Sequence, residues 1–265
     1  LLSKYNISGG PKYKTFSSII GVSEFLSELG KDYVVKFDGL AGGKGVKVSG
    51  DHLHSHRDAL DYCSEIITNK GTFVIEQKFV GEEFSLMSFC DGETLKHMPI
   101  VQDHKRAFEN DTGPNTGGMG TYSDVNHSLP FLNESDVNEA KSINLKTAKA
   151  LKEEFNEGYV GILYGGFIAT KNGVKLIEYN ARFGDPEAMN VLSILDSDFL
   201  EICDLMTKKK LKDINIKFKK KATVCKYAVP IGYPEEPVKN KPINLNKIEN
   251  PDNLYYASVD IKNDI

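Results

Sequence analysis

The chain has 265 residues, a length that suits one large domain or two modest ones. Hydrophobic residues make up 40% and charged residues 26%, which is ordinary for a folded protein and too apolar for a disordered one. The net charge of −4 argues against a general nucleic-acid-binding surface, and no run approaches the roughly 20 apolar residues that span a bilayer. We therefore expect a cytoplasmic protein with neither nucleic-acid nor membrane partners.

The first part of the chain predicts a compact unit of helices and strands. An apolar period from Ile19 to Leu29, opened by Ser17 and Ser18 and closed by Gly30, predicts a helix. Runs of β-branched and aromatic residues predict the strands that follow. In chain order we expect a strand at 33–37, a glycine-rich segment at 38–45, a short strand at 46–48, a helix across roughly 54–69 and a strand at 72–76.

The middle of the chain predicts further strands around one long helix. A strand at 83–89 turns at Asp91-Gly92 into a partner, and Lys171-Asn172-Gly173 indicates a second hairpin. Apolar residues spaced over 137–155 mark one face of the helix. Residues 102–123 are low in hydrophobicity, and we expect a long loop there.

The last part of the chain predicts a helix, a linker and the start of another domain. Asp185 is expected to cap a helix whose first residue is Pro186. Eight lysines fall within 208–221, which is more typical of a solvated face than of a nucleic-acid-binding patch. Short strands and prolines occupy 222–265.

The glycine-rich segment 38–45 follows the strand that carries Lys36. Glycine lets the backbone approach a ligand closely, and exposed N–H groups suit phosphate oxygens. Lys36 and Lys44 can neutralise a polyphosphate as point charges. The spacing matches neither a Walker A loop nor G-x-G-x-x-G, and a simple turn is the alternative interpretation.

Residues 76–83 cross from one predicted strand into the next unit. Such a crossing can form a cleft in which Phe79 and Val80 pack on a flat base while a carboxylate accepts ribose hydroxyls. A surface turn with solvated glutamates is the alternative.

Glu178 and Asn180 are two residues apart on a predicted strand, so their side chains share one face. A carboxylate and an amide oxygen suit Mg²⁺, which favours one or two protein ligands together with nucleotide phosphates and water. Arg182 falls two residues further on and reaches a developing anion if the strand continues. A polar strand end that faces solvent is the alternative.

Two polar stretches, 102–106 and 111–120, combine charged side chains with glycine-rich backbone. Charged anchors beside backbone donors are expected where an anionic sugar phosphate is held. The composition is too uneven for a flexible linker.

In this order, these stretches closely resemble the phosphoribosylamine–glycine ligase family of ATP-grasp enzymes. The resemblance rests on residues 35–45, 102–106, 112–120 and 178–187, and it thins after about residue 225. Gly42, Tyr179 and Ala181 differ from the residues common in the family, but none of these differences removes a charged or metal-binding group.

The resemblance implies an α+β protein with the ATP-grasp fold, in which two α+β subdomains enclose a nucleotide cleft, plus part of a C-terminal domain. We expect the end of an N-terminal domain or a linker over 1–12, a lid subdomain over 13–80, a larger subdomain over 81–207 and an incomplete C-terminal domain over 208–265. The chain would then begin near the junction into the lid and stop inside the C-terminal domain.

The implied reaction joins glycine to 5-phosphoribosylamine, with ATP giving ADP and phosphate through a glycyl phosphate intermediate. Mg²⁺ or Mn²⁺ is the implied cofactor, and a monomer or weak homo-oligomer is expected. Two alternatives remain open: an ATP-grasp ligase for another carboxylate–amine pair, and a truncated chain that binds Mg-ATP without turnover.

The resemblance also assigns residues to roles. ATP would be bound by Lys36, Asp38, Gly42, Gly43, Lys44, Glu76, Phe79, Val80 and Glu83. The metal would be held by Glu178 and Asn180. The substrates would be bound by Asp103, Lys105, Gly117, Gly118, Met119, Gly120, Arg182 and Asp185. Catalysis would depend on Arg182, Lys44 and Asp103.

Overall fold

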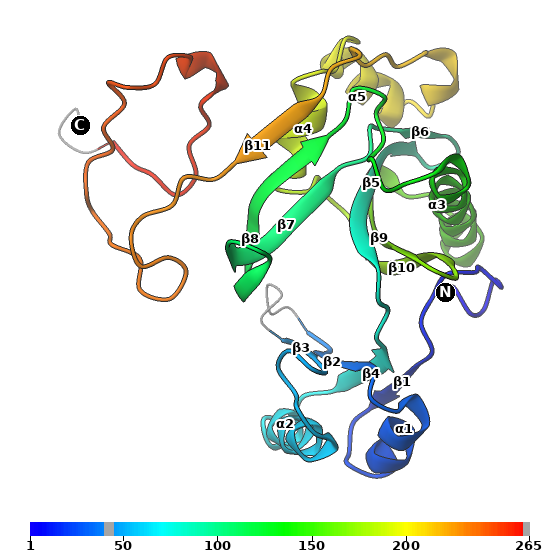
Figure 1. Ribbon diagram of the computed structural model, residues 1–265. Helices are drawn as coiled ribbons and strands as arrows, with labels where there is room; N and C mark the ends of the chain where they lie inside the picture. The colour runs from blue at the N-terminus through cyan, green and yellow to red at the C-terminus, as the bar shows by residue number, and fades with distance from the viewer. Residues whose placement is uncertain (40–44, 262–265) are drawn as a thin grey trace.

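The computed structural model describes residues 1–39 and 45–261 (Figure 1). Three sheets build the fold, with strand orders β1-β4-β2-β3, β10-β9-β5-β6 and β11-β8-β7. Every pair of neighbouring strands in them is antiparallel. The first sheet lies at one end of the molecule, and the other two lie together at the opposite end (Figure 1).

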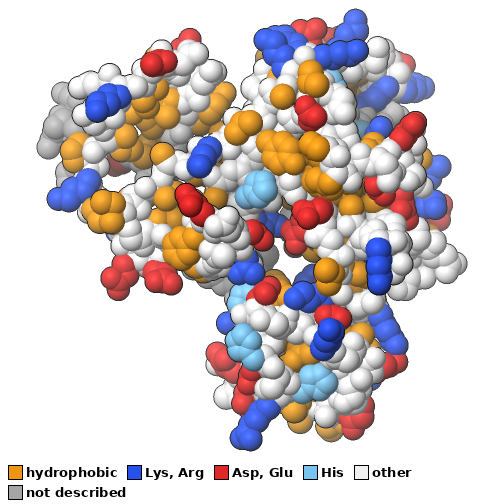
Figure 2. Space-filling model, viewed as in Figure 1, with side chains coloured by type: hydrophobic (Ala, Val, Ile, Leu, Met, Phe, Trp, Pro, Cys, Tyr) orange, Lys and Arg blue, Asp and Glu red, His pale blue; other side chains and the backbone are white. Residues whose placement is uncertain are grey.

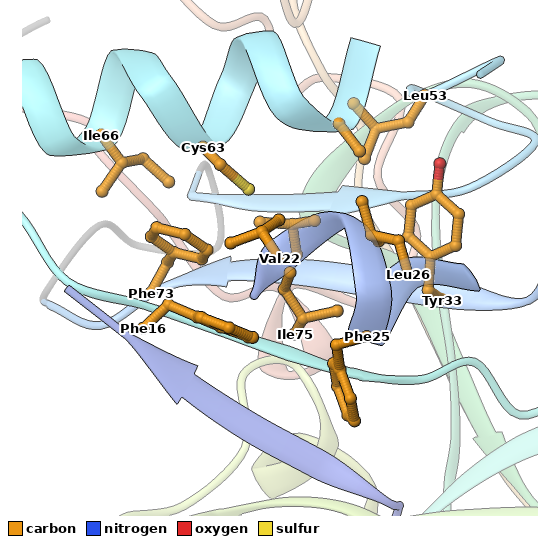
Figure 3. Close-up of a cluster of buried hydrophobic side chains, with 12 residues drawn as sticks. Phe16, Val22, Phe25, Leu26, Tyr33, Leu53, Cys63, Ile66, Phe73 and Ile75 are labelled. Carbon is orange, nitrogen blue, oxygen red and sulfur yellow. The ribbon is translucent and has the colours of Figure 1, made fainter. Parts of the chain in front are cut away.

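The first sheet and its two helices form a unit with its own core. Its elements are β1 (Tyr13–Phe16), α1 (Val22–Leu29), β2 (Tyr33–Phe37), β3 (Val46–Val48), α2 (His56–Thr68) and β4 (Phe73–Gln77). Both helices pack on one face of the sheet. Figure 3 shows the apolar side chains between them, among them Val22 and Leu26 of α1, Cys63 and Ile66 of α2, and Phe73 and Ile75 of β4.

Side chains of β2 and β4 point alternately to the helix-covered face of the sheet and to its other face. Val35 and Ile75 are paired in register and point into the helix-covered core. Since neighbouring residues of a strand point to opposite faces, Lys36 and Glu76 lie on the face away from the helices. The predicted strand at 33–37 is confirmed, and so is a helix within 54–69.

The first helix begins later than predicted. Gly21, with φ 79°, occupies its N-cap position, and no side chain caps this end. Ile20 stays outside the helix and is 83% exposed. By contrast α2 starts at a capping box between Ser55 and Asp58, which satisfies backbone N–H groups at its first turn.

The second sheet and one long helix form the larger core. Its elements are β5 (Glu82–Asp91), β6 (Leu95–His97), α3 (Glu134–Phe155), β9 (Val160–Thr170) and β10 (Gly173–Asn180). Helix α3 packs its apolar face on this sheet, with Ala140 and Ile143 against Phe167 and Leu176. The predicted hairpin at Lys171-Asn172-Gly173 is confirmed as the turn from β9 to β10.

The predicted loop over 102–123 is wrong. These residues form an antiparallel hairpin of β7 (Gln102–Phe108) and β8 (Thr112–Ser123). The hairpin lacks an apolar alternation because most of its side chains are at least partly accessible. Main-chain hydrogen bonds hold these strands in place. They join β7 to β8, and they join β8 to a third strand, β11 (Thr223–Lys226).

The predicted cap at Asp185 is also wrong. Helix α4 (Glu187–Leu192) has Pro186 at its N-cap position, with no side-chain cap bond. The Asp185 carboxylate instead accepts a hydrogen bond from the Tyr227 hydroxyl. Helix α5 (Phe199–Thr207) and two short 3-10 helices, Leu211–Asp213 and Pro251–Asn253, complete the described elements.

Within the described ranges, no helix combines the length and apolar character needed to cross a membrane.

Candidate active site

A pocket opens where the second sheet meets the β7–β8 hairpin. Its lining comes from β5, β7, β9 and β10: Glu83, Phe84, Ser85, Asp103, Lys105, Tyr164, Gly166, Phe167, Ile177 and Glu178. Figure 2 shows acidic and basic side chains around a hollow between the first unit and the rest of the molecule. Four predicted site residues line the pocket, namely Glu83, Asp103, Lys105 and Glu178.

A β-bulge at Ile177 determines which residues of β10 face the pocket. Before the bulge, Val174 and Leu176 are buried against α3. The register then shifts, so that Glu178 pairs with Gly166 while Leu176 pairs with Phe167. This extra residue reverses the alternation, as bulges do. Glu178 therefore points to the pocket instead of toward the helix.

The residues beyond the bulge divide between the two faces of β10. The Asn180 amide donates a hydrogen bond to Glu178 Oε1 at 3.0 Å, so the predicted same-face pair is present. Tyr179 lies on the opposite face, where its hydroxyl contacts Asn144 Oδ1 at 2.9 Å and Thr147 Oγ1 at 3.1 Å. Both partners are buried residues of α3. Hydrogen bonds to the core thus fix the strand that carries Glu178 and Asn180.

Side chains of the first unit reach the same region. Lys36 forms an ion pair with Glu76, and their side chains are only 23% and 14% exposed. Burial raises the pKa of the Glu76 carboxyl, Lys36 opposes that rise, and the negative charge of Glu178 adds to it. Glu76 is therefore close enough to Glu178 for the charge of Glu178 to raise the pKa of Glu76, although the two residues belong to different sheets.

Lys105 lies among carboxylates on the other side of the pocket. Its ammonium is 3.5 Å from Glu83 Oε2. Burial would lower the pKa of Lys105, but the negative charges of Glu83 and Asp103 outweigh it, and the pKa lies above its ordinary value. Lys105 therefore carries a positive charge at neutral pH.

Asp103 is the most perturbed carboxyl of the pocket. Burial, followed by the nearby charge of Glu187, raises its pKa to about 7, and Lys105 only partly opposes this. Among the residues that the structure describes, its buried Oδ1 atom has no hydrogen-bond partner. A buried acceptor without a donor costs free energy, which a bound ligand can recover.

Glu187 contacts the pocket-lining residue Tyr164, although sequence reasoning gave Glu187 no role in the site. Its side chain is 2% exposed and accepts a hydrogen bond of 2.8 Å from the Tyr164 hydroxyl. A Cβ atom at Gly184 would lie 2.4 Å from Glu187 Oε2, so only glycine leaves room for this carboxylate. The Gly-Asp-Pro-Glu sequence was the available signal, but burial could not be read from it.

The glycine-rich 117–120 segment, predicted as a turn, lies within strand β8 and packs directly against Asp103. Gly118 has φ +132°, and a Cβ there would lie 2.7 Å from Pro186 Cδ and 2.9 Å from Asp103 Oδ1. Its N–H donates to Thr116 Oγ1 at 3.1 Å, so this amide already has an acceptor. A Cβ at Gly117 would meet nothing within 4 Å, which leaves space beside this segment.

The remaining predicted residues are less closely gathered. Arg182 is exposed and donates to the Phe183 carbonyl at 2.8 Å. Strand β10 ends at Asn180, so Arg182 does not share a strand face with Glu178 and Asn180 as predicted. Asp38 accepts from the Thr72 hydroxyl at 3.2 Å. Val80, 71% exposed, lies with Phe79 in the link between β4 and β5. Gly42, Gly43 and Lys44 fall outside the described residues.

This arrangement of sheets is found in solved structures of ATP-grasp proteins. Phosphoribosylamine–glycine ligase from Thermotoga maritima superimposes with a TM-score of 0.78 and 27% identity, covering 89% of this chain and 59% of that one. The biotin carboxylase domain of 2-oxoglutarate carboxylase from Hydrogenobacter thermophilus shares the fold alone, with a TM-score of 0.58 and 13% identity over 84% of this chain and 47% of its own. The class is therefore ATP-grasp, as expected from the sequence.

The sequence narrows the class to one family. The family described as phosphoribosylglycinamide synthetase, ATP-grasp (A) domain, matches residues 1–188. Phosphoribosylamine–glycine ligase from Methanosarcina barkeri is 52% identical over 258 residues, which is 97% of this chain. The chain belongs to the phosphoribosylglycinamide synthetase ATP-grasp family, and it spans 59% of the length of that relative.

Proposed function

We propose that the chain carries the ligase activity of its family. The reaction joins the glycine carboxylate to the amine of 5-phosphoribosylamine and converts ATP into ADP and phosphate, a step of purine biosynthesis. The proposal rests on family membership together with one observation. The Lys36–Glu76 pair of the first unit lies close enough to Glu178 of β10 for the charge of Glu178 to act on Glu76, and Glu178 lines one pocket with Asp103 and Lys105 of β7.

The donor set at the end of β10 fits a hard divalent cation. Glu178 and Asn180 can supply a carboxylate and an amide oxygen side by side. Across the described ranges, no group of three or more His, Cys, Asp or Glu side chains gathers as a metal site. A site with few protein ligands suits Mg²⁺ or Mn²⁺ that is shared with nucleotide phosphates, where the ion supplies charge neutralisation and a template.

The charged side chains of the pocket divide the remaining tasks. Lys36 and Lys44 neutralise the triphosphate, and Phe79, Val80 and Glu83 line the adenosine end with Glu76. Lys105 and Arg182 hold the anionic substrate groups beside Asp103, Asp185 and the 117–120 segment of β8. These roles require positioning and charge stabilisation rather than a side-chain nucleophile.

The chemistry proceeds in two balanced steps. A glycine carboxylate oxygen attacks the terminal phosphorus of ATP, the bond to the bridging oxygen breaks, and ADP leaves. The amine nitrogen then attacks the carbonyl carbon of glycyl phosphate, and inorganic phosphate leaves with both electrons of the broken C–O bond. Asp103, whose pKa lies near 7, accepts the proton that the nitrogen loses.

Oxygen labelling tests this sequence of steps. Glycine labelled with ¹⁸O in its carboxylate should transfer one labelled oxygen to the released phosphate for each ADP formed. Phosphate without label would exclude an acyl phosphate derived from glycine. Turnover with a different amine would favour another ATP-grasp ligase, whereas Mg-ATP binding without ADP release would favour a nucleotide-binding module without catalysis.

A further inference from the structure

Strand β11 pairs with β8 next to the glycine-rich 117–120 segment of the candidate site, although β11 lies beyond residues 1–188 that match the family. Lys226 pairs with Gly120, and the Tyr227 N–H donates to the Met119 carbonyl at 3.0 Å. A Cβ at Gly120 would lie 3.1 Å from the Cys225 carbonyl oxygen, so the two backbones are in close contact. The main chain of β11 and of Tyr227 therefore contacts the 117–120 segment of β8 directly.

Tyr227, the residue after β11, links the 117–120 segment to Asp185. Its hydroxyl donates at 2.7 Å to Oδ1 of Asp185, which is an exposed residue. Asp185 precedes Pro186, and a Cβ at Gly118 would lie 2.7 Å from Pro186 Cδ and 2.9 Å from Asp103 Oδ1. The side chain of Tyr227, one residue beyond β11, thus connects this segment to Asp185.

The Tyr227 hydroxyl remains a donor across the working pH range. Burial and the adjacent Asp185 carboxylate raise the pKa of Tyr227 above its ordinary value. A hydrogen bond to an ionised acceptor is among the stronger ones in proteins. The contact therefore holds Asp185 in one orientation.

The junction around β11 does not depend on this hydroxyl alone. Asn190 of α4 donates to the Thr121 carbonyl at 3.3 Å and contacts the Thr223 hydroxyl at 3.2 Å. These bonds tie α4 to both β8 and β11 in the buried part of the junction. Loss of the Tyr227 hydroxyl should release Asp185 while the strands and α4 stay in place.

We propose that Tyr227 is a positioning residue for the amine-bearing sugar phosphate, acting through Asp185 and the 117–120 segment of β8. The inference rests on the proposed function, because it assigns the acceptor substrate to this side of the pocket. It extends the substrate site to a residue outside the family-matched range.

Steady-state kinetics of Tyr227→Phe tests the inference. The KM for phosphoribosylamine should rise about tenfold, the scale of one lost hydrogen bond to a charged group. The KM for ATP and the thermal midpoint should stay close to the wild-type values. Tyr159→Phe is the matched control, since it also loses one hydroxyl bond, to the Ile162 carbonyl, away from the pocket.

A double-mutant cycle separates positioning from general stabilisation. If Tyr227 acts through Asp185, Tyr227→Phe should change the KM by less than about twofold in an Asp185→Ala background. A Tyr227→Phe variant that matches the Tyr159→Phe control, or one whose effect persists fully without Asp185, would overturn the inference while leaving the ligase activity standing. A wild-type chain that does not use phosphoribosylamine at all would overturn the proposed function, and this inference with it.

Discussion

Arg106 of the β7–β8 hairpin and Asp51 of the first unit form an ion pair across the hollow, with Nη2 3.1 Å from Oδ2. Arg106 also donates to the Gly113 carbonyl at 2.8 Å, so the guanidinium is held within its own hairpin while it reaches the other unit. The hairpin and the first unit are thereby connected.

Removing this connection should weaken nucleotide binding. In Asp51→Asn the first unit loses a charged contact that favours its position over the pocket, so the Kd for ATP should rise about two- to fivefold at low salt, in line with a partly exposed pair. At roughly 1 M salt the difference should disappear because the pair is screened. Calorimetric titration with Mg-ATP measures both values.

Glu93→Gln supplies the control for that experiment. Glu93 pairs with Lys152 at 3.0 Å, and both residues belong to the larger core. Its loss should leave the Kd for ATP unchanged at either salt concentration. Equal effects of the two substitutions would mean that the Asp51–Arg106 pair has no special part in binding.

Glu178→Gln should abolish metal-dependent turnover without unfolding the chain. The substitution removes the negative charge while keeping the side-chain length and a hydrogen-bonding oxygen near Asn180. We expect kcat to fall at least about 100-fold, because charge neutralisation by a metal is worth several kcal/mol. Glu157→Gln, at an exposed site, is the control. Wild-type turnover in the Glu178 variant would exclude the metal role.

Asp103 should give the reaction an acid limb near pH 7. Its pKa is about 7, so the carboxylate that accepts the substrate proton forms only as the pH rises through that value. The pH profile of kcat/KM should therefore rise to a plateau above pH 7. Asp103→Asn should be about 100-fold less active and should lack this limb. An unchanged limb in the variant would assign it to another group.

The same carboxyl should lower stability at higher pH. The folded chain keeps the Asp103 proton up to about pH 7, whereas the unfolded chain loses it near pH 4. The folded state therefore binds more protons in this window, and its free energy of unfolding falls as pH rises from about 4 to about 7. Asp103→Asn should be more stable than wild type at pH 8, on the order of 1–2 kcal/mol, and similar at pH 4. The same advantage at both pH values would contradict this linkage.

Tyr179→Phe should destabilise the fold by about 1–2 kcal/mol in urea unfolding. The change leaves Asn144 Oδ1, in a residue that is 0% exposed, without the hydroxyl that donates to it. Tyr5→Phe loses a hydroxyl bond to exposed Glu154 and should cost less than about 0.5 kcal/mol. Equal stabilities of the two variants would show that the buried hydroxyl contributes nothing.

The regular elements were predictable where apolar periodicity is strong. β2 and α2 follow from β-branched runs and helical spacing, and the β9–β10 hairpin follows from Asn172-Gly173. The β7–β8 hairpin has no such pattern, because its side chains serve the pocket and solvent rather than a core. Main-chain pairing with β11, distant in sequence, cannot be read from local composition.

The candidate site was predictable in composition but not in orientation. The sequence places Glu178 and Asn180 on one face of a strand, but only the bulge at Ile177 decides that this face is the one toward the pocket. Glu187 and Tyr227 were missed because burial and long-range hydrogen bonds bring them to the site. The roles of the individual residues remain predictions that the variants above test.

Coupled ADP release shows directly whether the chain is an active ligase. The chain, supplied with Mg-ATP, glycine and phosphoribosylamine, should release one ADP for each glycinamide ribonucleotide formed, and omission of either acceptor should stop the release. Binding of Mg-ATP with no ADP released, under conditions where the Methanosarcina barkeri relative turns over, would contradict the ligase activity proposed for this chain.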